Sequence, residues 1–229
     1  MASELIISPH LDDAVLGCGH WLAAHPGTTV LTVFAGAPPD AAQRRTDWDG
    51  RCGFGDAAQA IAARRAEDAA ALRRLRAEPL WLDFLDSQYG DSPDAGKLAD
   101  ALQARLQALS PRRLLLPLGL FHSDHQLCHE AACRAAQRLP TPPLLLAYED
   151  VGYRVMPGLL QRRLAALAEA GVAATPEPGD AAADDAGWSA CAAAKRAAVQ
   201  AYASQWRALG RGMAADAEQP ERRWRLQPP

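Results

Sequence analysis

Two short polar clusters each follow a run of apolar residues that indicates a buried strand. Pro9-His10-Leu11-Asp12-Asp13 comes after residues 5–7, and His122-Ser123-Asp124-His125 comes after residues 114–118. Each cluster opens a segment whose apolar residues recur with helical periodicity. Ligands of an open α/β sheet bind in the crevice outside the carboxyl ends of its strands. We therefore expect imidazole and carboxylate groups from two separate strands to meet in one site.

Strands and helices alternate along the chain, a pattern that predicts a parallel sheet covered by helices. The expected strands are residues 4–8, 29–35, 79–84, 113–117 and 143–148, and the expected helices are residues 12–24, 56–76, 94–109, 124–138, 159–170 and 188–209. The expected fold class is α/β, a Rossmann-like three-layer sandwich with a mostly parallel sheet and a metal site at the strand C-terminal edge. We expect a single domain over residues 1–229, with a core over residues 1–150 and a C-terminal helical part over residues 151–229.

A polar stretch, residues 36–55, separates the second strand from the second helix. It carries glycine, proline and aspartate together with two aromatic residues, Trp48 and Phe54. Loops of this length inside a domain are usually functional or disordered. Two interpretations stay open: an aromatic ring stacks on a substrate, or the rings fill a gap against the following helix.

Charge and cysteine usage limit the partners. The net charge of −3 gives no support for broad binding to phosphate backbones, so no nucleic-acid partner is expected. No secretory signal is expected, because residues 1–3 lead straight into a strand with no basic region and no apolar h-region. No membrane span is expected, because no apolar run approaches the roughly 20 residues that cross a bilayer. Five cysteines without CxxC spacing suggest reduced thiols in a cytoplasmic protein. The tail Glu221-Arg222-Arg223-Trp224-Arg225 is expected to be solvated, and the oligomeric state stays open, a homo-oligomer included.

Carboxylates also follow the third and fifth expected strands, namely Asp83, Asp86, Glu149 and Asp150, and His129 lies one helical turn beyond His125. At least three strands therefore contribute polar side chains to the same edge. Two or three histidine or carboxylate ligands with an open position are typical of a catalytic divalent site, with Zn²⁺ foremost.

Each cluster also has a purely structural interpretation. The aspartate pair could serve as the N-cap of a helix, and His122 and His125 could lie on a surface helix. The presence of both clusters after strands at one edge favours the metal site. The spacing does not choose between His122/His125 and His125/His129 as a ligand pair, because either pair shares a helix face. His20 and His25 are expected to be ordinary surface or packing histidines.

The two clusters resemble the motifs of a known enzyme family. Ser8-Pro9-His10-Leu11-Asp12-Asp13-Ala14-Val15-Leu16-Gly17-Cys18-Gly19 is similar to the first motif of the PIG-L/LmbE-like zinc-dependent N-acetyl sugar deacetylases, and His122-Ser123-Asp124-His125 is similar to their second, usually His-Pro-Asp-His. The likeness extends to Arg64-Arg65-Ala66-Glu67, to Asp86, and to Lys195 with Tyr202-Ala203-Ser204-Gln205. It therefore covers most of the chain.

The chain departs from the usual motifs at a few positions. Leu11 stands where proline is usual, Ala14 where glutamate is frequent, and Ser123 where the second motif has proline. Some relatives place a tyrosine just before the second motif, where this chain has Leu120 and Phe121. None of these departures removes an expected ligand.

The resemblance implies a division of labour. It makes His10, Asp13 and His125 the metal ligands, Asp12 the general base and His122 the second catalytic group. Zn²⁺ lowers the pKa of a bound water towards ~7 and polarises an amide carbonyl. Asp12 would take the proton during attack, and His122 would stabilise the oxyanion or protonate the leaving amine.

Other residues are expected to surround this centre. Substrate contacts are expected from Arg64, Asp86, Trp48 and Glu149, and Asp124 is expected to support the ligands from behind. Zn²⁺, one per chain, is the expected cofactor, and Fe²⁺ could replace it in the cell.

The expected function is metal-dependent hydrolysis of an N-acetyl group from a small-molecule amino sugar or amino-sugar-containing metabolite, such as a glycan, glycolipid or antibiotic precursor, with release of acetate. One alternative is an amide hydrolase for a non-sugar N-acyl amine, and another is a sugar- or nucleotide-binding module whose metal site has decayed. A dinucleotide enzyme is excluded, because Gly17-Cys18-Gly19 lies inside the first helix and no Gly-x-Gly-x-x-Gly follows the first strand.

Overall fold

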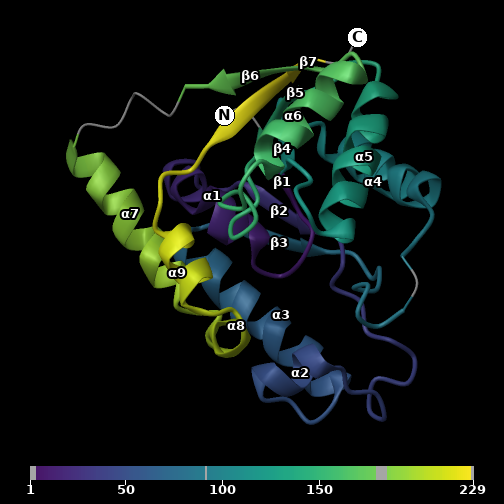
Figure 1. The fold of residues 1–229 in the computed structure, drawn as a ribbon, viewed down its shortest axis with the longest axis vertical. Helices are drawn as coiled ribbons and strands as arrows, with labels where there is room; N and C mark the ends of the chain where they lie inside the picture. The colour runs from purple at the N-terminus through teal and green to yellow at the C-terminus, as the bar shows by residue number, and fades with distance from the viewer. Residues whose placement is uncertain (1–3, 91, 179–184, 228–229) are drawn as a thin grey trace.

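A seven-stranded sheet forms the centre of the molecule. The computed structural model describes residues 4–90, 92–178 and 185–227. The strand order is β3-β2-β1-β4-β5-β7-β6, and Figure 1 shows it running from β3 at the bottom to β6 at the top. The strands are β1 Glu4–Ser8, β2 Thr29–Thr32, β3 Glu78–Trp81, β4 Arg113–Pro117, β5 Leu144–Tyr148, β6 Ala173–Glu177 and β7 Arg223–Gln227. β1 to β5 pair in parallel, whereas β7 is antiparallel to both β5 and β6.

Helices cover both faces of this sheet. They are α1 Asp13–Ala24, α2 Asp47–Cys52, α3 Ala57–Arg74, α4 Ala95–Leu109, α5 Ser123–Gln137, α6 Leu159–Glu169, α7 Asp185–Val199, α8 Ala203–Ala208 and α9 Arg211–Ala217. In Figure 1, α4 and α5 lie on one side of the sheet and α1 and α7 on the other. The expected α/β three-layer sandwich with a mostly parallel sheet is confirmed.

The core divides at the sheet because successive strand residues point to opposite faces. Leu5 and Ile7 pack with the apolar side chains of α4, α5 and α6. Ile6, between them, packs with α1, α3 and α7 on the other face. Because β1 lies inside the sheet and is buried on both faces, its three central residues, 5–7, are all apolar rather than alternating with polar ones.

The parallel part of the sheet follows the expected elements closely, with two differences. The second strand was expected over residues 29–35 but ends at Thr32, and Phe34 forms only an isolated bridge with Asp83. The stretch 36–55 is not a loop throughout, because α2 forms within it. Thr46 starts that helix with a capping box in which its side chain accepts from the Asp49 backbone N–H.

The expectation for residues after 150 was incomplete. This part also contains β6 and β7, and the helix expected over residues 188–209 is two helices, α7 and α8. The tail is solvated only in part. The Arg222 side chain is 68% exposed, whereas the Glu221 side chain is 3% exposed and accepts a hydrogen bond from Lys195 Nζ at 2.9 Å. The Arg223 guanidinium lies 4.6 Å from the centre of the Trp21 ring. Paired charges and an aromatic contact therefore bury arginine and glutamate residues that normally indicate a surface.

No described helix has both the length and the apolar character needed to cross a bilayer.

Candidate active site

A cavity of about 370 Å³ opens at the carboxyl edge of the sheet. Its lining comes from the β1–α1 turn, α2, α3, the segment after β3, the start of α5, the turn after β5, and α8 with α9. β1 and β4 are neighbouring parallel strands, so the turns that come after them deliver the two polar clusters to one place. We call this cavity the cleft.

Three potential ligands converge in the cleft. Asp13 Oδ2 lies 3.3 Å from His10 Nδ1 and 3.3 Å from His125 Nε2. The three ligand atoms form a group in which all lie within 4.8 Å of one another. Asp13 Oδ2 also accepts the His10 backbone N–H at 2.8 Å, which fixes the turn between β1 and α1. Two nitrogens and one carboxylate oxygen therefore face a common point.

A buried carboxylate holds the far side of each imidazole. Asp124 Oδ2 lies 3.0 Å from His10 Nε2, and Asp150 Oδ1 lies 2.7 Å from His125 Nδ1. Both carboxylates are anchored, because Asp124 accepts from the Ser87 N–H at 3.1 Å and Asp150 accepts from the Leu120 N–H at 2.8 Å. Such partners fix the orientation and tautomer of a metal-binding histidine. They leave His10 Nδ1 and His125 Nε2 free to face Asp13.

The electrostatics of this group suit a cation. Burial opposes protonation of His125, yet Asp13 and Asp150 raise its pKa to about 10. Burial likewise opposes ionisation of Asp13, yet His125 and His10 lower its pKa well below the usual range. The carboxylates are therefore balanced by protons held on the imidazoles, and a divalent cation offers the same balance. The nitrogen and oxygen donor set fits Zn²⁺ or Fe²⁺.

Asp12 lies next to this group without belonging to it. It occupies the N-cap position of α1, but within the described part of the chain its side chain makes no capping hydrogen bond. The carboxyl instead lines the cleft. Burial and the neighbouring Asp13 raise the pKa of Asp12 to about 6. The structural interpretation of the aspartate pair as a helix cap therefore does not describe Asp12.

His122 caps α5 and lines the same cleft. Its Nδ1 accepts the Asp124 backbone N–H at 3.2 Å. Burial lowers the pKa of His122, and the neighbouring His10 and His125 lower it further. The ring is therefore neutral near neutral pH, and because Nδ1 is an acceptor, its proton lies on Nε2. Its ring stands edge-on to His10, with 5.1 Å between ring centres.

The structure separates the two ligand pairs that the sequence left open. His129 lies outside the group, where its Nδ1 is 2.9 Å from the Pro117 carbonyl and its Nε2 is 3.7 Å from Cys133 Sγ. His20 stacks on Trp188 and His25 on Trp21, as expected of packing histidines. His125, which belongs to both pairs, contacts Asp13, and His122 lies in the same cleft, so the structure favours the pair His122/His125 over His125/His129.

Three of the four expected substrate contacts line the cleft. Arg64 NH1 lies 3.5 Å from Asp86 Oδ2, and the two side chains form one wall. Trp48, from α2, forms another part of the lining and donates from Nε1 to Gln205 Oε1 at 3.2 Å. Phe54, expected beside it, is described by the structure but does not belong to the lining.

The expectation for Glu149 was wrong. This side chain is 1% exposed and accepts from Trp224 Nε1 at 3.0 Å, so it points to β7 rather than into the cleft. β7 pairs beside β5 and covers it. Asp83 also lies elsewhere, on the surface, where it pairs with Arg65 at 2.9 Å.

For some residues of the site, the sequence alone indicated no specific role. Asp150 was noted as a strand-end carboxylate, and its position gave the only signal for its bond to His125. Tyr153, Met213 and Gln205 line the cleft from the turn after β5 and from the C-terminal helices. No local pattern in the sequence distinguishes Tyr153 and Met213 from packing residues.

The family model described as PIG-L, GlcNAc-PI de-N-acetylase, matches residues 5–136. A comparison with curated proteins found no match.

Among solved structures, A40926 pseudoaglycone deacetylase Dbv21 is 27% identical, with a TM-score of 0.74 over 99% of this chain and 97% of that chain. Teicoplanin deacetylase Orf2, in its zinc-inhibited form, is 24% identical, with a TM-score of 0.77 over 98% of each chain. The 4-carboxy-2-hydroxymuconate hydratase GalB of Pseudomonas putida KT2440 shares the fold at 20% identity and a TM-score of 0.62, over 100% of this chain and 97% of that chain. Since the family model covers more than half of the sequence, the chain belongs to the PIG-L family.

Proposed function

We propose that this protein hydrolyses the N-acetyl group of an amino sugar or an amino-sugar-containing metabolite and releases acetate. The observation that carries the proposal is the convergence of His10, Asp13 and His125 beside the carboxyl of Asp12, which lines the cleft and does not cap α1. Membership of the PIG-L family supports it, as does the likeness to Dbv21, which is named a deacetylase.

His10, Asp13 and His125 would hold one divalent ion, with Zn²⁺ the first candidate and Fe²⁺ the second. Such an ion, when bound, supplies Lewis acidity towards water and towards an acyl carbonyl. The chain contributes the orientation of the ligands, because Asp124 and Asp150 fix the two imidazoles. These carboxylates also increase the basicity of the imidazoles they contact.

Asp12 acts as the general base. Its carboxyl lines the cleft and is held by no cap, so it is available to accept a proton from the attacking water. A pKa of about 6, raised by burial and by Asp13, keeps the group ionised at neutral pH while making it a stronger base than an exposed aspartate. The same carboxyl then carries the proton to the nitrogen of the leaving amine.

His122 stabilises the negative charge that develops on the acyl oxygen. It is a neutral ring whose Nδ1 accepts the Asp124 N–H, so Nε2–H is the donor presented by this side chain. A donor fixed before the reaction stabilises an oxyanion without a cost of reorientation. The N-cap position on α5 fixes the ring.

Binding of the sugar falls to the other walls of the cleft. Arg64 and Asp86 offer a donor and an acceptor to hydroxyl groups. Trp48 offers the edge and face of a ring, and its bond to Gln205 holds that ring in place.

The proposal is tested by acetate release from a panel of N-acetyl amino sugars, their glycosides and non-sugar N-acetyl amines, with each metal supplied in turn. Release from sugars supports the proposal. Release from the non-sugar amines alone would replace it with a different amide hydrolase, and release from neither would leave a binding module.

The ligand assignment is tested by metal analysis of two histidine variants. His125→Ala should lose most of the metal, whereas His129→Ala, which removes a buried histidine of the same helix outside the group, should keep it. Retention of the metal in His125→Ala would contradict the assignment.

A further inference from the structure

Apolar side chains are exposed beside the cleft. Among the described residues, five large hydrophobic side chains are exposed: Leu109, Phe121, Val155, Met156 and Trp188. Three of these lie on the two segments that flank the cleft: Phe121 directly before His122, and Val155 and Met156 directly after Tyr153 and Arg154. Phe121 is 59% exposed and Val155 is 61% exposed. We call the neighbouring rings of Phe121 and Tyr153 the aromatic rim.

Phe121 is held on this rim at the expense of backbone strain. Its φ is +37°, a left-handed conformation that costs free energy for a bulky residue. A glycine or asparagine would adopt this conformation more readily, and a polar side chain would suit an exposed position better. Packing into the core does not explain the ring, because more than half of the residue is in solvent. Strain of this kind concentrates at functional sites.

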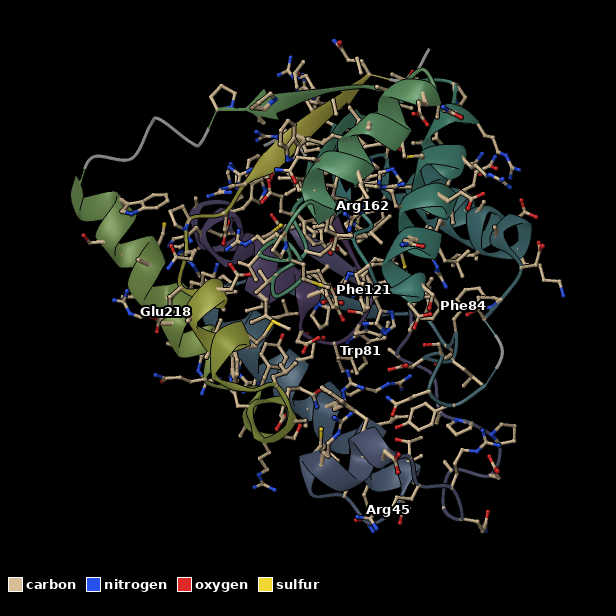
Figure 2. The ribbon with its side chains drawn as sticks, viewed as in Figure 1. Arg45, Trp81, Phe84, Phe121, Arg162 and Glu218 are labelled. Atoms are coloured by element: carbon tan, nitrogen blue, oxygen red, sulfur yellow. The ribbon has the colours of Figure 1, made fainter. Side chains whose placement is uncertain are left out.

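Tyr153 connects the exposed ring to the reacting groups. Its ring centre lies 5.5 Å from that of Phe121 and 5.6 Å from that of His125. Tyr153 lines the cleft, whereas Phe121 stands outside it at the N-terminal end of α5, where Figure 2 labels it. The rings therefore form a continuous path from the metal ligands to the solvent.

The turn that carries the other half of the rim is fixed to the rest of the molecule. Asp216, from α9, accepts from Arg154 Nε at 2.9 Å and from the Gly152 N–H at 2.6 Å. Arg154 also donates to the Pro220 carbonyl at 3.0 Å. The rim is therefore a preformed surface, which reduces the entropic cost of binding a ligand on it.

The size of the cleft indicates what lies on this surface. A volume of about 370 Å³ is near the lower end for ligand pockets. A substituent on a sugar whose N-acetyl group lies near His125 can extend past the Tyr153 ring towards the exposed ring of Phe121. The aromatic rim provides an apolar path for that substituent.

We infer that the substrate is an amino-sugar glycoside with a flat, apolar aglycone, which stacks on Phe121 and Tyr153 while the sugar occupies the cleft. This inference rests on the proposed function. Continuity of the rings with the cleft favours the substrate itself over a membrane surface or a second copy of the chain as the occupant. Phe121 is a specificity residue in this account and takes no part in the reaction.

Two pairs of ligands test the inference. Acetate release is compared for the phenyl and methyl glycosides of N-acetylglucosamine. Binding is compared by calorimetry for the phenyl and methyl glycosides of glucosamine, which have no acetyl group to lose. The variants are Phe121→Ala, Phe121→Gly, which relieves the backbone strain, and the control Leu109→Ala, which removes an exposed apolar side chain at the end of α4.

The wild type should prefer the phenyl compounds. Both Phe121 variants should reduce that preference by about 2- to 12-fold, the size of an aromatic contact, through a loss on the phenyl compounds. Leu109→Ala should leave the preference intact. Equal handling of phenyl and methyl compounds by the wild type, or a preference that survives in Phe121→Gly, would overturn the inference. If no acetate is released from any compound, the proposed function fails, and the calorimetric preference alone decides whether the rim binds the ring.

Discussion

Replacement of Asp150 by asparagine should weaken metal binding although Asp150 does not face the metal position. Its Oδ1 lies 2.7 Å from His125 Nδ1, and its Oδ2 accepts the Leu120 N–H at 2.8 Å. Both of these neighbours require an acceptor when His125 presents a bare Nε2 to a metal. Asparagine has one oxygen and one NH₂ group, so it satisfies only one of them.

The loss of metal affinity follows from the competition between His125 and Leu120 for the single oxygen of the asparagine. If the asparagine oxygen faces Leu120, its NH₂ group faces His125 Nδ1 and moves the imidazole proton to Nε2, which can then no longer bind a metal. If the oxygen faces His125, the buried Leu120 N–H meets another donor, and the carboxylate charge is lost in either case. Loss of such a partner typically costs about 10- to 100-fold in affinity, or about 1.4–2.7 kcal/mol. We expect a value near the upper end.

The assay is competition for Zn²⁺ between the protein and a chromophoric chelator at fixed pH. Asp68→Asn is the matched control, because Asp68 is an equally buried aspartate that accepts from Trp81 Nε1 and the Tyr202 hydroxyl, away from the three ligands. An Asp150→Asn affinity within about twofold of wild type would show that His125 binds the metal without help from this carboxylate. An equal loss in Asp68→Asn would also contradict this role of Asp150.

Two further predictions concern Glu221, which lies just before β7, and Trp48 of α2. Burial opposes ionisation of Glu221, yet Lys195 and His20 lower its pKa to about 2 from the usual 4.5, so its ionised form stabilises the fold by about 3 kcal/mol. Because the pKa of Glu221 is lower in the folded state, this stability is present above pH 4.5 and is lost as the pH falls towards 2. Glu221→Gln should therefore flatten the pH dependence of the unfolding free energy between pH 4.5 and 2. An unchanged slope would contradict the pairing. Trp48→Ala should raise the KM for N-acetyl glycosides by about 3- to 10-fold, the size of an aromatic contact, with metal content and folding unchanged; unaltered kinetics would assign Trp48 to packing.

The site could be predicted as far as it depended on parallel strands. His10 and His125 lie far apart in the sequence, but each follows a strand, and β1 and β4 are neighbours whose carboxyl ends meet. The rule that ligands bind at this edge was therefore sufficient to bring them together. The choice between the pairs His122/His125 and His125/His129 needed the structure, because a helix face can carry either pair.

The errors arose where charged residues are buried by partners distant in the sequence. Glu149 follows β5 as Asp150 does, but β7 pairs with β5 and Trp224 Nε1 donates a hydrogen bond to the Glu149 carboxylate. Arg223 and Glu221 have the composition of a solvated tail, and only the contacts with Trp21 and Lys195 explain their burial. Local propensity and periodicity contain no information about such long-range partners.

The proposed mechanism requires Asp12 to be a base beside the ligands and not itself a ligand. Metal content and the rate of acetate release, measured on the same metal-replete sample of Asp12→Asn, test it most directly. We expect one metal per chain, as in the wild type, and a rate reduced by about 10²–10⁴-fold, as is typical when a general base is lost. Near-normal activity would contradict the role of Asp12, and loss of the metal would make it a ligand.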